Sequence, residues 1–165
     1  TPVRRLIDDD YSKGMMYYKK ANKLFLEAKR SSLNILLNRY PNFNQWIKKD
    51  LTIYFDLKDT YDLYWLAASM AGAIQSSRGS NPYELINIPT IGKLLETAIF
   101  LDPNWESGSL FSAMMSYSAI RPDLSGQAMK DTVDYYFKKS LEISDSLDAS
   151  VFVSYAELIL SLIHI

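Results

Sequence analysis

The chain has 165 residues, of which 48% are hydrophobic, and this is enough for one globular domain with a substantial core. Its 18 lysines and arginines against 19 aspartates and glutamates give a net charge of −1, so no basic excess attracts nucleic acid. Because the chain contains no cysteine, its composition excludes disulfides, thiolate metal sites and cysteine nucleophiles.

Hydrophobic residues at three- and four-residue spacing predict helices along almost the whole chain. The first extends from Asp10 to Arg39, as one long amphipathic helix or as two helices separated by a slight break. Pro41 and Asn42 end it. The following residues, 43–51, are predicted to form a shorter helix or a turn that directs Trp46 toward the core.

The next predicted helix begins at Asp59 and is rich in small residues. They leave little side-chain bulk, so we expect a neighbouring helix to approach closely at Ala67, Ala68, Ala71, Gly72 and Ala73. The nearly apolar run over 63–74 is far shorter than the roughly 20 residues needed to span a bilayer. It therefore predicts a buried helix of a soluble domain.

A segment of turn-forming residues, 76–89, follows, and Pro89 opens a helix that extends to about Leu101. The same patterns predict further helices from Trp105 to just before Arg121, over 127–144, and from Val151 onward. The expected total is six or seven antiparallel helices joined by short loops.

The helix that ends near Leu101 has the closing residues of a tetratricopeptide-type repeat. Ala98 and Leu101 are followed by Asp102 and Pro103, so a helix that packs through small residues is stopped by a proline. Residues 140–145 form a weaker version of this ending. The spacing between the two endings is longer than an unmodified repeat, which has about 34 residues. We predict an all-α fold of antiparallel helix pairs, forming a tetratricopeptide-like helical repeat scaffold.

The sequence offers no residue set for catalysis, for a cofactor or for a metal. His164 is the only histidine, and the glycines are isolated rather than gathered in a phosphate-binding loop. Asp8, Asp9 and Asp10 form the one acidic cluster, and carboxylates are ligands for hard cations. Since they lack the alternation and the glycine of a calcium loop, we interpret them as a solvated helix start.

The aromatic residues are the remaining candidates for a site, because amphipathic rings suit both interfaces and apolar ligand walls. Tyr64 and Trp65 are adjacent on a predicted helix and point about 100° apart, so at most one sits squarely in the core. The other is then free to face a groove or a subunit surface. Trp105 is the third candidate contact, or else a helix-start anchor. Ordinary core packing is the alternative for all three.

Five sequence blocks occur in one order: LFLEAKRSSLNIL (24–36), YWLAASMAGAI (64–74), LLETAIFLDPNW (94–105), VDYYFKKSLEIS (133–144) and SYAELI (154–159). Together they resemble the T-component of tripartite ATP-independent periplasmic (TRAP) transporters, a helical, tetratricopeptide-like subunit. The resemblance implies a non-catalytic, lipid-anchored periplasmic lipoprotein that forms a homotrimer and docks the substrate-binding subunit of a solute uptake system. It also implies a hydrophobic small molecule as ligand.

On the repeat ending alone, a generic cytoplasmic tetratricopeptide adaptor that holds a peptide in a concave groove is the alternative. The first residues, TPVRRLIDDD, carry no signal peptide, and the leader, lipid-bearing cysteine and N-terminal helices of the family would lie upstream of them. We expect residues 1–159 to form a single helical domain. The last six residues, LSLIHI (160–165), resemble a translated sequencing-adapter end, or else they continue an apolar helix.

Overall fold

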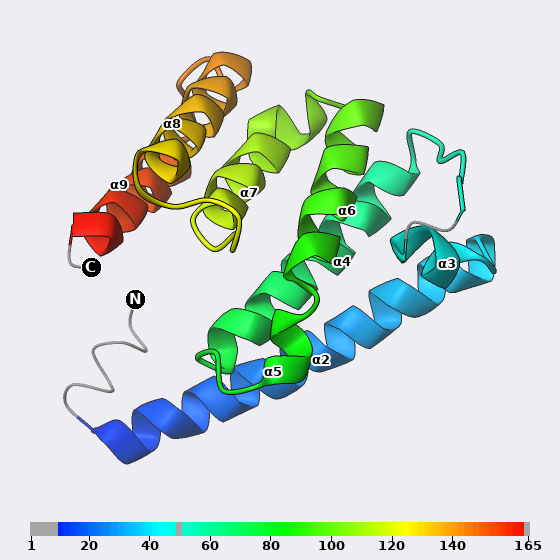
Figure 1. Ribbon diagram of the computed structural model, residues 1–165, viewed down its shortest axis with the longest axis horizontal. Coiled ribbons are helices and arrows are strands. Elements are labelled where there is room, and N and C mark those ends of the chain that lie inside the picture. Colours follow the sequence, from blue (N-terminus) through cyan, green and yellow to red (C-terminus); the bar gives the residue numbers. More distant parts are fainter. Residues whose placement is uncertain (1–9, 49–50, 164–165) are drawn as a thin grey trace.

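The computed structural model describes residues 10–48 and 51–163, and the regular structure in these residues is entirely helical. The all-α prediction is therefore confirmed, while the tetratricopeptide-like arrangement stays a prediction. The helices, drawn in Figure 1, are α2 (Tyr11–Arg39), α3 (Phe43–Ile47), α4 (Asp59–Ser76), α5 (Pro82–Leu85), α6 (Ile88–Leu101), the 3-10 helix η1 (Trp105–Gly108), α7 (Ser109–Ser118), α8 (Gly126–Ile143) and α9 (Ala149–Ile163).

Helix α2 is a single unbroken helix, which settles the choice between one helix and two. Its N-terminus is capped by Asp10, whose carboxylate accepts a hydrogen bond of 3.0 Å from the backbone N–H of Lys13. At the other end Tyr40 caps the helix, and Pro41 cannot continue it. The interpretation of the acidic cluster as a helix start is confirmed for Asp10, while residues 8 and 9 lie outside the described residues.

Helix α4 packs along α2 in one half of the molecule (Figure 1). The two helices are in tight contact at Gly72, where an added Cβ would lie 2.4 Å from ring atoms of Phe25. Only glycine leaves room for this ring, so the prediction of close helix packing is confirmed on this face of α4. A hydrogen bond also joins the two helices, because the side-chain amide of Asn22 donates to the carbonyl of Ala73 over 2.9 Å.

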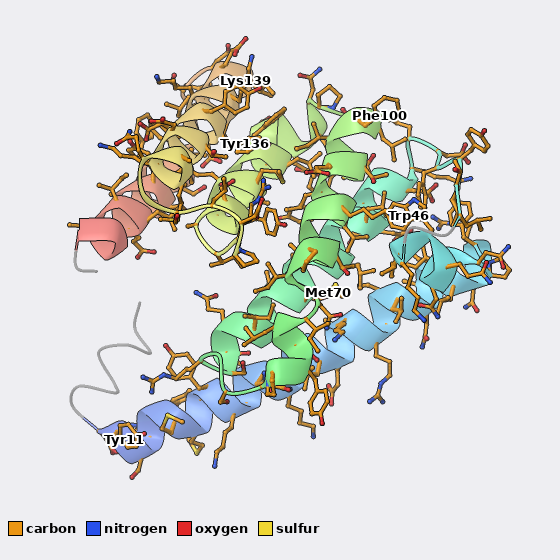
Figure 2. The ribbon with its side chains drawn as sticks, in the orientation of Figure 1. Tyr11, Trp46, Met70, Phe100, Tyr136 and Lys139 are labelled. Atoms are coloured by element: carbon orange, nitrogen blue, oxygen red, sulfur yellow. The ribbon has the colours of Figure 1, made fainter. Side chains whose placement is uncertain are left out.

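The short helix α3 directs Trp46 into the core, as predicted. Its indole stacks on Phe43 at a centroid distance of 5.3 Å and meets Phe55 edge-on at 5.0 Å. Figure 2 shows Trp46 and Met70 with the side chains around them in this half of the molecule. Burial of one such large side chain stabilises the fold by roughly 1.5–3 kcal/mol. The core continues through the buried residues Leu36, Leu63, Leu66, Leu94, Leu95, Ala98, Leu110 and Met114.

The segment between α4 and α6 contains a helix that the turn-forming residues did not predict. Asn81 caps α5 by accepting a 3.1 Å hydrogen bond from the backbone N–H of Tyr83, and Pro82 occupies the first turn. A proline at this position needs no backbone donor, so the same residues that favour a turn can begin a short helix. The predictions that Pro89 opens α6 and that Asp102 ends it are confirmed.

The prediction of one helix starting at Trp105 is wrong. The backbone of Glu106 and Ser107 takes positive φ angles of 45° and 51°, and Gly108 reaches 92°, so η1 ends there and α7 begins at Ser109. The physical reason is contact with α8: a Cβ on Gly108 would lie 2.9 Å from the carbonyl of Ser140. The hydroxyl of Ser140 in turn donates to the carbonyl of Gly108 over 3.1 Å.

Helices α7, α8 and α9 form the second half, on the far side of α6 from α2 in Figure 1. Tyr136 of α8, labelled in Figure 2, lies 6.4 Å from the ring of Phe111 of α7. Helix α9 is tied to α8 by Tyr155, whose ring stacks on Phe137 at 4.0 Å and whose hydroxyl donates to Asp134. The adapter origin expected for 160–165 stays a prediction, and His164 lies outside the described residues.

Across the described ranges, every helix is either too short or too polar to cross a membrane.

Candidate functional site

The three aromatic residues singled out in the sequence lie together at the junction of α4 and η1. The ring of Tyr64 lies 4.6 Å from that of Trp105 and 5.3 Å from that of Trp65, measured between centroids. Tyr61 joins them at 6.1 Å from Trp65. We call Tyr61, Tyr64, Trp65 and Trp105 the aromatic cluster. Sequence reasoning missed Tyr61, although its four-residue spacing from Trp65 places both on one helix face.

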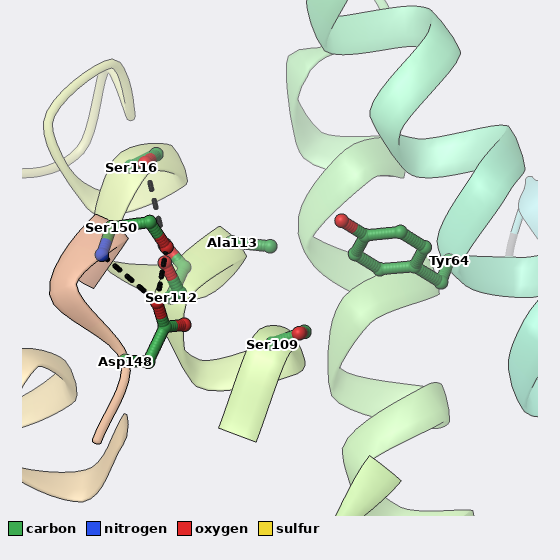
Figure 3. A pocket seen from close by; sticks show the side chains of 7 residues that line it. All are labelled: Tyr64, Ser109, Ser112, Ala113, Ser116, Asp148 and Ser150. Carbon is green, nitrogen blue, oxygen red and sulfur yellow. Dashed lines mark hydrogen bonds between the residues drawn. The ribbon is translucent and has the colours of Figure 1, made fainter. Parts of the chain in front are cut away.

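The aromatic cluster has an exposed side and a half-buried side. Trp65 is 46% exposed and Tyr61 is 58% exposed, whereas Tyr64 and Trp105 are half-buried. Burial raises the pKa of Tyr64, and the negative charge of Glu106 raises it further, so the phenol stays protonated well above neutral pH. Tyr61 and Trp65 are therefore accessible to a partner on the exposed side, while Tyr64 directs its hydroxyl toward the interior (Figure 3).

The first turn of α4, which precedes these aromatics, is held to the end of α2 by a buried carboxylate. Asp59 is fully buried and accepts hydrogen bonds from the Tyr40 hydroxyl, from Nη1 of Arg39 and, over 2.7 Å, from the backbone N–H of Asp56. Asp62 accepts a second bond from Arg39 over 2.8 Å. We call this set of contacts around Asp59 the carboxylate latch, and it fixes the helix start that presents the aromatic cluster.

The carboxylate latch shifts the pKa values of its own members. Burial alone would raise the pKa of Asp59, but hydrogen bonds from Tyr40, the Asp56 backbone and Arg39 outweigh burial and lower it. Burial, and then the hydrogen bond to Asp59, raise the pKa of Tyr40 to about 12. At neutral pH, Asp59 is therefore ionised and accepts hydrogen bonds, while the Tyr40 hydroxyl stays protonated and donates one.

Next to Tyr64 lies a polar hollow of about 260 Å³. Figure 3 shows Tyr64 of α4 on one side, with its hydroxyl directed toward α7, and the start of α9 on the other. The α7 side chains Ser109, Ser112 and Ser116 recur at three- and four-residue spacing and so share one helix face. Asp148 and Ser150 complete the lining with Ala113.

Asp148 is the carboxylate of the polar hollow. Its Oδ1 accepts hydrogen bonds from the backbone N–H of Ser150 over 2.9 Å and from the Ser150 hydroxyl over 2.6 Å. These bonds lower the pKa of Asp148, so the group is ionised at neutral pH. The polar hollow thus combines a fixed negative charge, several hydroxyls and one aromatic ring.

An apolar hollow of about 550 Å³ adjoins it, and the two share Ala113 and Ser116 on α7. We call the two hollows together the groove, with α4 and α9 as walls and α7 between them. The apolar hollow is lined by Ala67, Ala68, Ala71, Ile74, Gln75, Ile91, Leu95, Ala113, Ser116, Tyr117, Ile120, Ser154, Glu157 and Leu158. Its volume lies within the ~300–1,000 Å³ typical of small-molecule pockets.

The groove corrects part of the expectation for the small residues of α4. Gly72 receives a side chain of α2, but Ala68 and Ala71 face the apolar hollow instead of a tightly packed helix. Their short side chains leave space rather than fill it. Periodicity could not separate these two roles, because Ala68 and Gly72 are four residues apart and so lie on nearly the same side of α4.

No group of three or more histidine, aspartate or glutamate side chains in the described ranges is placed to hold a metal ion.

A family model described as TRAP transporter T-component matches residues 1–163 of the chain. A protein of Treponema pallidum (strain Nichols), described as an uncharacterized protein, is 25% identical over 139 residues. The alignment covers 79% of this chain but only 42% of that relative, so the chain spans less than half of the relative's length.

Proposed function

Because the chain belongs to the TRAP transporter T-component family, we propose that it is a non-catalytic accessory subunit of a TRAP-type solute uptake system that binds the substrate-binding subunit. The observation that carries this proposal is the family match over residues 1–163. A transporter component needs binding surfaces rather than reacting groups. The aromatic cluster and the groove are surfaces of that kind.

The same family membership supports the cellular location and the assembly that we propose. The subunit works in the periplasm, held at the membrane by a lipid anchor that lies outside residues 1–165, and it assembles as a homotrimer. Residues 1–159 act as one helical domain. Cell fractionation of the source organism tests the location, since a protein found in the cytoplasm would favour the generic tetratricopeptide adaptor.

For the surface that contacts the substrate-binding subunit we propose the exposed side of the aromatic cluster. Tyr61 and Trp65 present large, rigid rings at low entropic cost, and such rings dominate the energy of many interfaces. The carboxylate latch and the contact with Trp105 hold them in place before a partner arrives. Preorganisation of this kind lowers the cost of binding.

For the groove we propose the role of holding a small hydrophobic ligand in transit. The volume of the apolar hollow and its alanine, isoleucine and leucine lining suit such a ligand. The polar hollow beside it is lined by Tyr64, whose ring lies 5.3 Å from that of Trp65, so the ligand site adjoins the proposed docking surface. A partner bound to the aromatic cluster would then lie close to the ligand.

Isothermal titration calorimetry with the cognate TRAP substrate-binding subunit tests the proposed function. We expect binding by the wild-type chain and a loss of at least about tenfold in affinity for Trp65→Ala, the size of effect seen at interface hot spots. Tyr83→Ala is the matched control, because Tyr83 is an 80% exposed aromatic on α5 outside the cluster. A folded wild-type chain that gives no heat with the substrate-binding subunit would refute the proposal.

A further inference from the structure

The two ends of the groove differ in chemistry, and this difference indicates what its ligand looks like. The polar end offers the hydroxyls of Ser109 and Ser112 and the carboxylate of Asp148. The apolar end is bounded by Ile74, Ile91, Leu95, Ile120 and Leu158. A wholly apolar ligand would leave the polar hollow unused, and a wholly polar one would leave the apolar hollow bare. The groove therefore matches a molecule with one polar end and one alkyl end.

The charges along the groove select the kind of polar end. The ionisable carboxylates that line it are Asp148 and Glu157, and neither hollow is lined by a lysine or an arginine of the described residues. Arg121 contacts a lining residue, with its guanidinium 5.6 Å from the centre of the Tyr117 ring, but it is bound to Asp123 over 2.6 Å. An anionic head would therefore meet negative charge, with no lysine or arginine among the described lining residues to offset it.

The surroundings of Tyr64 add a second reason to expect a cation. A positive charge is attracted to the face of an aromatic ring and to a carboxylate. Tyr64 and Asp148 line the same hollow, on opposite sides of it (Figure 3). The positive end of the α9 dipole does not favour an anion here, because Asp148 already accepts the Ser150 N–H at that helix start.

We propose that the groove binds a single-chain amphiphile with a cationic amine head, the amine lying between Tyr64 and Asp148 and the alkyl chain lying along Ala68 and Ala71 in the apolar hollow. The proposal rests on the ligand-binding role proposed for the groove above and gives that ligand its chemical class. It places the head at the α7 serines and the tail toward Leu158.

Three probes with ten-carbon chains test the head group: decylammonium, decyl maltoside and decanoate. Each is titrated into the chain at pH 7 below its micelle concentration, with calorimetry as the readout. We expect decylammonium to bind about tenfold or more tightly than decanoate, because a hydrogen bond to a charged group contributes about 1.5–3 kcal/mol. Equal or tighter binding of decanoate, or tightest binding of the uncharged maltoside, would overturn the proposal.

Isosteric variants test the position of the head. Asp148→Asn removes the charge and keeps an oxygen that can cap α9, and we expect it to weaken decylammonium binding by about tenfold while sparing decyl maltoside. Glu157→Gln, at the apolar end, should have a smaller effect. Asp131→Asn is the control, since Asp131 is exposed on α8 and lines neither hollow. A larger loss for Glu157→Gln than for Asp148→Asn would refute the placement of the head.

Filling the apolar hollow tests the position of the tail. Ala68→Trp adds an indole to the wall of the groove, and we expect it to abolish binding of all three probes while circular dichroism shows an unchanged helix content. Undiminished binding by the folded variant would show that the probes sit elsewhere and would overturn the proposal. Calorimetry with the substrate-binding subunit is run separately, so failure of the amine proposal and failure of the transport role are told apart.

Discussion

Replacing Asp59 by alanine tests the carboxylate latch that joins α2 to α4. The substitution removes the acceptor of hydrogen bonds from the Tyr40 hydroxyl, the Asp56 backbone N–H and Arg39. Arg39 keeps Asp62 as a partner at 2.8 Å, and its side chain is 35% exposed, so water replaces most of what it loses. The main loss is two donors left without an acceptor next to a fully buried position.

The size of the effect follows from those two donors. An unsatisfied buried donor costs about 1–3 kcal/mol, and removal of the carboxylate returns part of the energy spent in burying it. We expect the free energy of unfolding to fall by about 3 kcal/mol, a large share of the ~5–15 kcal/mol that stabilises a typical domain. The melting temperature should then fall by roughly 10 °C.

Urea denaturation followed by circular dichroism measures this loss. Asp56→Ala is the matched control, because the Asp56 side chain is 68% exposed and pairs with the exposed Lys58 over 3.1 Å. A surface pair of this kind contributes about 0–1 kcal/mol. If Asp59→Ala costs no more than Asp56→Ala, the carboxylate does not hold the two helices together and the reasoning is refuted.

Three further changes follow from particular contacts. Thr60→Val removes a buried hydroxyl that has no hydrogen-bond partner among the described residues, so we expect the melting temperature to rise or stay equal. A fall would contradict this expectation. Gly92→Ala places a Cβ 2.4 Å from the Tyr117 hydroxyl, so we expect it to destabilise the fold by about 1–3 kcal/mol. Urea denaturation measures this loss, and an unchanged free energy of unfolding would show that the Tyr117 side chain moves aside without cost. Stability should also depend on pH through the latch. The lowered pKa of Asp59 stabilises the fold above about pH 4, and this stability is lost as pH falls through the folded-state pKa. The pKa of Tyr40, raised to about 12, also stabilises the fold, and this stability is lost as pH rises from about 10 to 12. Tyr40→Phe should flatten the alkaline loss in a pH series of urea melts, and an unchanged alkaline slope would count against the assignment.

Much of the fold could be predicted because helix periodicity and helix ends are local properties. Asp10, Pro41 and Pro89 act within a turn or two of their own positions, so the sequence carries the start or end of each helix they mark. The kink at Gly108 could not be predicted in this way. It depends on contact with Ser140, which is distant in the sequence, so the residues near 108 do not predict it.

The candidate site was predicted in part for the same physical reason. Helical spacing showed that Tyr64 and Trp65 point in different directions, and the structure places them with Trp105 in one cluster. The groove could not be predicted, because Ala68 lines it while Gly72, four residues later, packs against Phe25. Side-chain size is similar at the two positions, and only the arrangement of α2, α7 and α9 separates them.

Binding of the substrate-binding subunit is the role that we propose for this chain in a TRAP transporter. Calorimetric titration of the chain, expressed with every residue that its gene encodes, against the cognate substrate-binding subunit measures this binding. We predict saturable binding that weakens at least about tenfold in Trp65→Ala and stays unchanged in Tyr83→Ala. Absence of binding by the folded wild-type protein would contradict the claim.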